Sequence, residues 1–209
     1  MKTRAEEFIP TRPSLLCRLK DWENGEDWKI FFDTYWRLIF SVALKAGLTE
    51  NEAEEVVQET IISVCKQMPD FEYNKAGSFK AWLLQIVRRR VSDQFRKRAP
   101  IQERPTEDTR TDFLERIPSS EARLEDVWEE EWRRNLIETA ITKVKNRIKP
   151  RFFQIFDLVV LKEWPVSEVA RGLNVSSAQV YLTRHRVTRL IRDEVRRMEK
   201  EAGSRSHCR

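Results

Sequence analysis

The sequence predicts an all-α protein made of two small helical domains that an acidic linker joins. Apolar residues recur at helical spacing along almost the whole chain, and no run shows the alternation of a strand. Only five of the 209 residues are glycine, while seven tryptophans and eleven phenylalanines supply core anchors. Residues 100–119 are rich in proline and acid and poor in core-forming residues, which is typical of a linker.

The N-terminal half begins with an arm, residues 1–27, in which prolines mix with charged residues. A helical pattern then runs over residues 28–46 and ends at Gly47, a residue that commonly terminates helices. Thr49 opens the next helix with Glu52 three residues later, which predicts a capping box. This second helix continues to the proline that follows Met68.

The third helix, residues 78–98, has two faces. At about 100° per residue one face is apolar, and it consists of Phe79, Trp82, Leu83, Ile86 and Val87. The opposite face is polar, and it consists of Gln85, Arg88, Arg89, Ser92 and Arg96. An ordinary solvated cationic face would explain this pattern, but so many adjacent bases repel each other unless a polyanion is near.

After the linker, helical spacing resumes at Ser120 and continues to Pro150. Short helices are predicted at 151–163 and 165–172, and a long helix from Ser177 towards Lys200. Residues 201–209 are expected to form a disordered tail.

Residues 164–191 have the pattern of a helix-turn-helix. Ala170 is the small residue where two helices cross, and Asn174 suits the left-handed turn conformation. Ser176 and Gln179 predict a capping box at the start of the second helix. The apolar lock is expected from Val169, Leu173, Val175 and Val180, and the buried stripe of the long helix from Val180, Val187, Leu190 and Ile191. We favour DNA binding over a plain helical hairpin with a solvated arginine face.

Charge is unevenly distributed although the net charge is only +5. Residues 88–98 hold six bases and one acid, and residues 184–209 hold nine bases and four acids. Acidic stretches separate these two zones, since residues 50–59 hold five glutamates and residues 103–131 hold eleven acids. The distribution predicts a polyanion held at two places.

Other classes of protein are disfavoured. Three scattered cysteines and two histidines fit neither a disulfide framework nor a zinc site, and no cofactor site is indicated. No apolar run reaches transmembrane length, and the N-terminus lacks a signal-peptide core. We therefore expect a cytoplasmic protein without a membrane span.

Glu52, Glu55 and Glu59 share one face of the second helix. A metal site is disfavoured because no histidine or second acidic helix converges on them in the sequence. A solvated face is a better interpretation, and a protein-docking face is better still because Gln58 and apolar residues surround the carboxylates.

The segment EAEEVVQETIISV, followed after a loop by FKAWLLQIVRRRVSDQFRKR, resembles region 2 of bacterial RNA polymerase sigma factors. The helix-turn-helix is similar to region 4 of the extracytoplasmic-function (ECF) group. The resemblance covers about 31–98 and 121–197. It implies that 28–99 is region 2 and 120–200 is region 4, with 100–119 lying in the nucleic-acid channel of the polymerase.

The resemblance implies roles for particular residues. Those that match the helix that docks on core polymerase are Glu55, Gln58 and Glu59. Those that match the loop and helix at the minus-ten element are Tyr73, Asn74, Ser78, Phe79, Trp82, Arg88, Arg89, Asp93 and Arg96. Those on or near the helix that reads the minus-thirty-five element are Ser176, Ser177, Gln179, Tyr181, Arg184, Arg186 and Arg189. Trp82 suits the core equally well, and we favour that interpretation.

The sequence departs from the family pattern at several places. Arg89 stands where asparagine is common, and Leu182-Thr183 replaces Ser-Arg in the recognition helix. The helix around Trp128 and Trp132 is bulkier than in typical members, and the arm is longer. The promoter sequence is therefore not transferable.

The resemblance implies core RNA polymerase and promoter DNA as partners, an anti-sigma factor as a further candidate, and a monomer when free. It implies no catalytic activity. One alternative is a helix-turn-helix repressor or activator that works without polymerase, with an N-terminal half that binds a ligand or a second copy. An enzyme of the resolvase or nuclease kind is disfavoured, because Ser177 and Tyr181 lie in the DNA-reading helix with no base nearby in the sequence.

Overall fold

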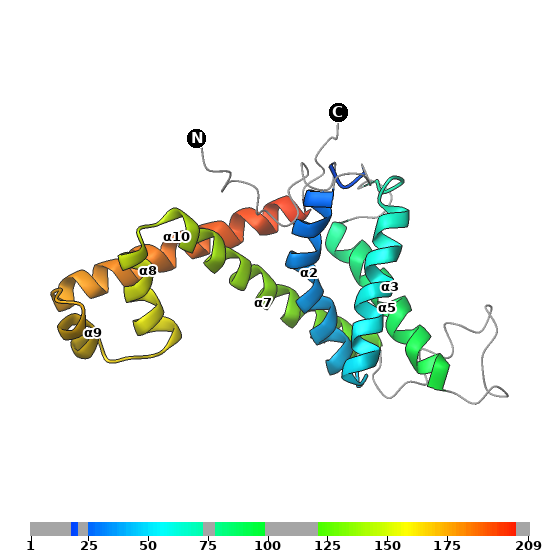
Figure 1. Cartoon of the computed structure of the whole chain (residues 1–209), viewed down its shortest axis with the longest axis horizontal. Helices are drawn as coiled ribbons and strands as arrows, with labels where there is room; N and C mark the ends of the chain where they lie inside the picture. Colours follow the sequence, from blue (N-terminus) through cyan, green and yellow to red (C-terminus); the bar gives the residue numbers. More distant parts are fainter. Residues whose placement is uncertain (1–17, 21–24, 73–77, 99–120, 204–209) are drawn as a thin grey trace. The chain divides into compact units, whose positions relative to one another are not determined.

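The computed structural model describes residues 18–20, 25–72, 78–98 and 121–203. Over these residues every extended regular element is a helix, so the predicted all-α class is confirmed (Figure 1). None of the helices in these ranges is long and apolar enough to cross a membrane. The predicted arm, linker and tail lie almost wholly outside the described residues.

Contacts divide the chain into two compact units. We call the part that runs to Asn135 the N-terminal unit and Leu136–Glu199 the C-terminal unit. The division falls inside a long helix, α7 (Glu121–Arg147), whereas the sequence had suggested that the second domain begins at residue 120. The first part of α7 therefore packs in the N-terminal unit.

Three further helices build the N-terminal unit: α2 (Gly25–Lys45), α3 (Glu50–Gln67) and α5 (Phe79–Arg98). Gly47 has φ +96°, a conformation that side-chain-bearing residues rarely adopt, which explains why α2 ends there. The capping box that opens α3 is confirmed: the Thr49 backbone N–H donates to Glu52 at 2.8 Å, and the Glu52 backbone N–H donates to the Thr49 hydroxyl.

Aromatic rings form the core of the N-terminal unit. Phe79 is fully buried, and its ring centroid lies 5.5 Å from that of Tyr35 and 5.7 Å from that of Trp82. Trp82 in turn lies 4.7 Å from Phe71. From α7, Trp132 stacks on Tyr35 at 5.9 Å. These contacts fix α2, α5 and the first part of α7 around one centre.

The C-terminal unit contains the last part of α7, then α8 (Pro150–Phe156), a π-helical turn η3 (Asp157–Leu161), α9 (Val166–Gly172) and α10 (Ser177–Gly203). Its helix-turn-helix is held by a small apolar cluster of Ile155, Val169, Ala170 and Val180, against which Leu173 and Val175 pack. The predicted lock is therefore confirmed.

The turn between α9 and α10 follows the prediction. Asn174 has φ +49°, the left-handed conformation that asparagine tolerates. The backbone N–H of Ser176 donates to the Gln179 side chain at 3.0 Å, and the backbone N–H of Gln179 donates to the Ser176 hydroxyl at 3.2 Å. Glu163, before α9, also has a positive φ of 56°, which no feature of the sequence predicted.

A buried carboxylate fixes α10 against the last part of α7. Glu194 is 5% exposed and forms ion pairs with Lys143 and Arg147, each at 3.1 Å, and with Arg197 at 2.5 Å. Burial alone raises the pKa of Glu194, but hydrogen bonds from Arg197 and Lys143 outweigh this effect and lower it. The carboxylate therefore stays ionised and ties the two helices together.

Candidate nucleic-acid interface

The outward side of α10 carries the residues predicted to read duplex DNA. The exposed members are Ser176, Ser177, Gln179, Tyr181, Arg184, Arg186 and Arg189. The Arg184 guanidinium lies over the Tyr181 ring, 5.1 Å from its centroid, which orders both side chains. Val180 and Val187 face the interior, at 0% and 2% exposure. The helix thus presents a cationic surface while its opposite side is anchored in the core.

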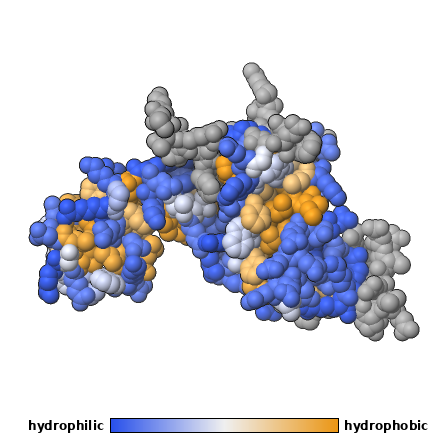
Figure 2. Space-filling model, viewed as in Figure 1, coloured by the Kyte–Doolittle hydropathy of each residue, from blue (hydrophilic) through white to orange (hydrophobic). Residues whose placement is uncertain are grey.

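The prediction that Leu190 is buried is wrong. Leu190 is 36% exposed, and the buried stripe of α10 instead continues through Ile191 to Glu194. Leu190 and Phe152 both border a recess of about 310 Å³. The space-filling view shows apolar surface among the polar surface of α8, α9 and the start of α10 (Figure 2).

The basic face of α5 is largely neutralised by acids of the same chain. Arg88 faces Glu125 of α7 at 3.5 Å, and Arg96 pairs with Asp93 at 2.6 Å. Arg89 is exposed. Ser92, predicted to lie on the polar face, is 3% exposed. That expectation is wrong because helices pack on more than one side of α5.

The predicted minus-ten loop is described only in part. Tyr73 and Asn74 lie outside the described residues. The Ser78 hydroxyl accepts a hydrogen bond from the Ala81 backbone N–H at 3.1 Å, so it caps the first turn of α5. Phe79 is completely buried, so its ring does not offer a surface on which a base could stack. Trp82 is 8% exposed and packs among aromatic rings, in agreement with the core interpretation.

The acidic face of α3 is turned towards the C-terminal half of α5. Glu55 accepts hydrogen bonds from Lys97 at 2.8 Å and from Gln94 at 3.0 Å, and both contacts lower its pKa. Glu52 pairs with Arg98 through two contacts. The Arg98 guanidinium, helped by the Thr49 backbone, lowers the pKa of Glu52 to about 2.

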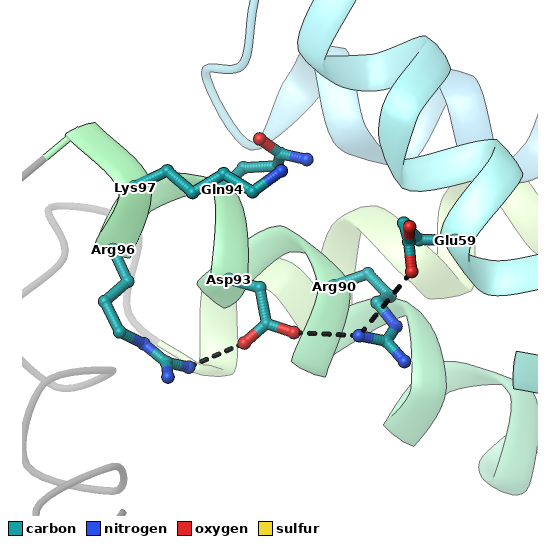
Figure 3. Close-up of a pocket in the computed structure, with 6 residues that line it drawn as sticks. All are labelled: Glu59, Arg90, Asp93, Gln94, Arg96 and Lys97. Atoms are coloured by element: carbon teal, nitrogen blue, oxygen red, sulfur yellow. Dashed lines mark hydrogen bonds and ion pairs between the residues drawn. The ribbon is translucent and has the colours of Figure 1, made fainter. Parts of the chain in front are cut away.

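Glu59 is held less tightly. Its carboxylate lies 3.9 Å from Arg90 and is 49% exposed, and Gln58 beside it is exposed. Figure 3 shows a chain of ion pairs from Arg96 through Asp93 and Arg90 to Glu59, with Glu59 on α3 and the other three on α5. These residues border an open recess of about 340 Å³. A mixed-charge surface of this kind suits a protein partner better than a bare polyanion.

The contribution of α7 was missed from the sequence. Its acids meet cations of α5 and α2: Glu129 pairs with Lys80 at 2.6 Å, and Glu131 pairs with Lys45 at 2.8 Å. Glu131 and Glu130 raise the pKa of Lys45. The unusual Trp128 and Trp132 were the available signal, because two tryptophans one turn apart predict a buried face, and Trp128 is 1% and Trp132 4% exposed.

Comparison with known proteins agrees with this geometry. Residues 31–101 match the family model of sigma-70 region 2. The matched range contains α3 and α5 and most of α2.

Over 183 residues the chain is 26% identical to a protein of Bacillus subtilis (strain 168) named "ECF RNA polymerase sigma factor SigX", a match that covers 84% of this chain and 87% of that relative. The match is long enough to extend beyond region 2. The region 2 match and this likeness show that the chain is similar to RNA polymerase sigma factors, and the relative that it matches over most of its length is named as one of the ECF group.

Proposed function

We propose that this protein binds core RNA polymerase and directs transcription initiation at specific promoters. The observation that carries the proposal is the combination, in one chain, of a sigma-70 region 2 match over 31–101 and a capped helix-turn-helix with exposed arginines. Region 2 alone would not supply a duplex-reading element, and a helix-turn-helix alone would not supply a polymerase contact.

Upstream duplex would be held by α10. An α-helix fits the major groove, and in this fold the second helix of the motif enters it. Arg186 and Arg189 are exposed on that helix and are suited to phosphate contacts, whereas Gln179 near its N-terminus is suited to base edges. Binding through these arginines is expected to weaken steeply with added salt.

Melted strand would be held by α5 and the loop before it. Arg89 is exposed, and Arg88 and Arg96 could exchange their present acidic partners for phosphates. Tyr73 and Asn74 remain the candidates for capturing an unpaired base, for which stacking on an aromatic ring is worth about 1–3 kcal/mol. Phe79 and Trp82 would act from the core by holding the first turns of α5 rigid.

Core polymerase would dock on α3. Glu59 and Gln58 present the more accessible part of this surface, and Glu55 lies within its ion-pair network. In this mechanism the chain positions DNA and polymerase and performs no covalent step of its own. We further propose that it is monomeric when free, works in the cytoplasm and is open to control by an anti-sigma factor.

In vitro transcription with purified core enzyme on genomic fragments tests the proposal. The expected result is a set of discrete start sites that appear only when this protein is added. A repressor or activator that ignores polymerase would instead bind a duplex operator unaided, and it would produce no new start sites with core enzyme. That outcome would refute the sigma-factor mechanism.

A further inference from the structure

We propose that Leu182 is a specificity-determining residue that reads thymine methyl groups in the upstream promoter element. The inference deepens the proposed function, since it rests on α10 entering the major groove. Leu182 is not among the residues that the family resemblance assigns to DNA contact.

Leu182 lies on the outward side of α10. The buried side of the helix contains Val180 and Val187, at 0% and 2% exposure. Leu182 comes two residues after Val180, which at about 100° per residue places it on the opposite side. It is 71% exposed, the highest value among the large hydrophobic side chains that the structure describes. An apolar side chain at the outermost line of this helix is placed to contact an apolar group of the surface on which the helix docks.

Basic side chains lie on the same side of α10 as Leu182. Arg186 and Arg189 follow it by one and two helical turns and are exposed. Tyr181, which precedes Leu182, is also exposed, and its ring packs against Arg184. A leucine in line with two exposed arginines suits a duplex, because arginines can contact phosphates on the groove walls while the leucine points at the base edges.

The chemistry of the groove then selects the ligand group. Leucine has neither a donor nor an acceptor, so it cannot read the polar atoms of the bases. The apolar group that the major groove presents is the C5-methyl of thymine. Leu182 therefore favours thymine over cytosine at the base that it touches.

A protein segment is the competing occupant of this surface. Leu182 also borders the recess of about 310 Å³ that contains Phe152 and Leu190. Those two side chains are 37% and 36% exposed, about half the exposure of Leu182. Leu182 is thus more exposed than both of these apolar side chains of the recess. This difference favours a partner that contacts the outer face of α10.

Replacement of thymine by deoxyuracil tests the proposal, because it removes one methyl group and keeps every polar atom. Promoters found by start-site mapping would have each upstream thymine replaced singly, and binding by the holoenzyme would be measured. One buried methyl group is worth about 0.8 kcal/mol, so wild-type holoenzyme should lose about fourfold in affinity at one or two thymines. Leu182→Ala should bind more weakly and lose this sensitivity, while Leu182→Met should retain it.

The matched control is Leu161→Ala, since Leu161 is also exposed (48%) but lies in η3. Its holoenzyme should keep wild-type sensitivity to deoxyuracil. Wild-type affinity that is unchanged at every replaced thymine would overturn the role of Leu182. The proposal would also be overturned if Leu182→Ala lost its association with core polymerase and the wild-type holoenzyme showed no deoxyuracil effect. That result would assign Leu182 to a protein contact. Absence of any core-dependent promoter would refute the proposed function itself.

Discussion

Glu194 shows how one residue can connect two helices. It pairs with Lys143, Arg147 and Arg197, and removal of its charge would leave the buried Lys143 ammonium without compensation. We expect Glu194→Gln to lower the free energy of unfolding by about 3 kcal/mol. Urea denaturation followed by circular dichroism measures this, with Asp193→Asn as the exposed neighbouring control. Equal effects of the two substitutions would contradict the role of Glu194.

Glu52 makes a smaller, pH-dependent contribution at the start of α3. Its pKa of about 2 in the folded state lies below its ordinary value of 4.5, so its stabilisation is present above about pH 4.5 and is lost as pH falls towards 2. We expect Glu52→Gln to cost about 1 kcal/mol at neutral pH, the size of a cap contact, because water screens an exposed pair.

Thermal unfolding across this pH range is the measurement for Glu52. The difference in Tm between wild type and Glu52→Gln should shrink from pH 5 to pH 2. Glu54→Gln, which removes an exposed carboxylate from the same helix, should show no such trend. A difference that grows as the pH falls would mean that the Arg98 contact does not stabilise the fold.

At the scale of elements, the first part of α7 is a structural component of the N-terminal unit. Trp132 stacks on Tyr35, and Lys80 lies 5.6 Å from the centre of the Trp132 ring. We expect Trp132→Ala to lower stability by about 3 kcal/mol because it opens a cavity in the aromatic core. The control is Ile137→Ala on the same helix, where the side chain is 47% exposed.

Near-ultraviolet circular dichroism during urea unfolding would report this loss directly from the aromatic core. If Trp132→Ala unfolds at the same urea concentration as Ile137→Ala, the first part of α7 is only loosely attached. That result would contradict the structural role of this part of α7 in the N-terminal unit.

At the scale of the whole molecule, the proposed function assigns binding of upstream duplex DNA and binding of polymerase to different units. We expect Arg186→Ala and Arg189→Ala each to weaken promoter binding by roughly tenfold and to reduce its salt dependence, without any loss of core-polymerase binding. Glu59→Lys should instead weaken core-polymerase association, because it reverses a half-exposed charge on α3.

Pull-down of core polymerase and promoter gel shifts separate these effects. Glu54→Lys is the matched control for Glu59→Lys, since Glu54 is exposed on the same helix but points about 140° away. Loss of core-polymerase binding in the arginine variants would refute the division of labour between the units.

The sequence by itself determined the features that depend on residues close together along the chain. The all-α class follows from helical spacing, and both capping boxes and the Asn174 turn follow from residues at most four positions apart. The region 2 motif was also recognisable, and the comparisons confirm it.

Only the tertiary structure decided which neighbour each helix face meets. Periodicity gives the direction of a side chain but not what lies there, so it placed Ser92 and Leu190 wrongly. It placed Phe79 correctly on the apolar face, whereas the family resemblance made Phe79 a candidate base contact although the core encloses its ring. It also could not show that Glu55 meets Lys97, 42 positions later, or that α7 acids cover Lys80 and Arg88. Such contacts depend on how separate helices pack, which is a property of the assembled bundle and not of any one segment.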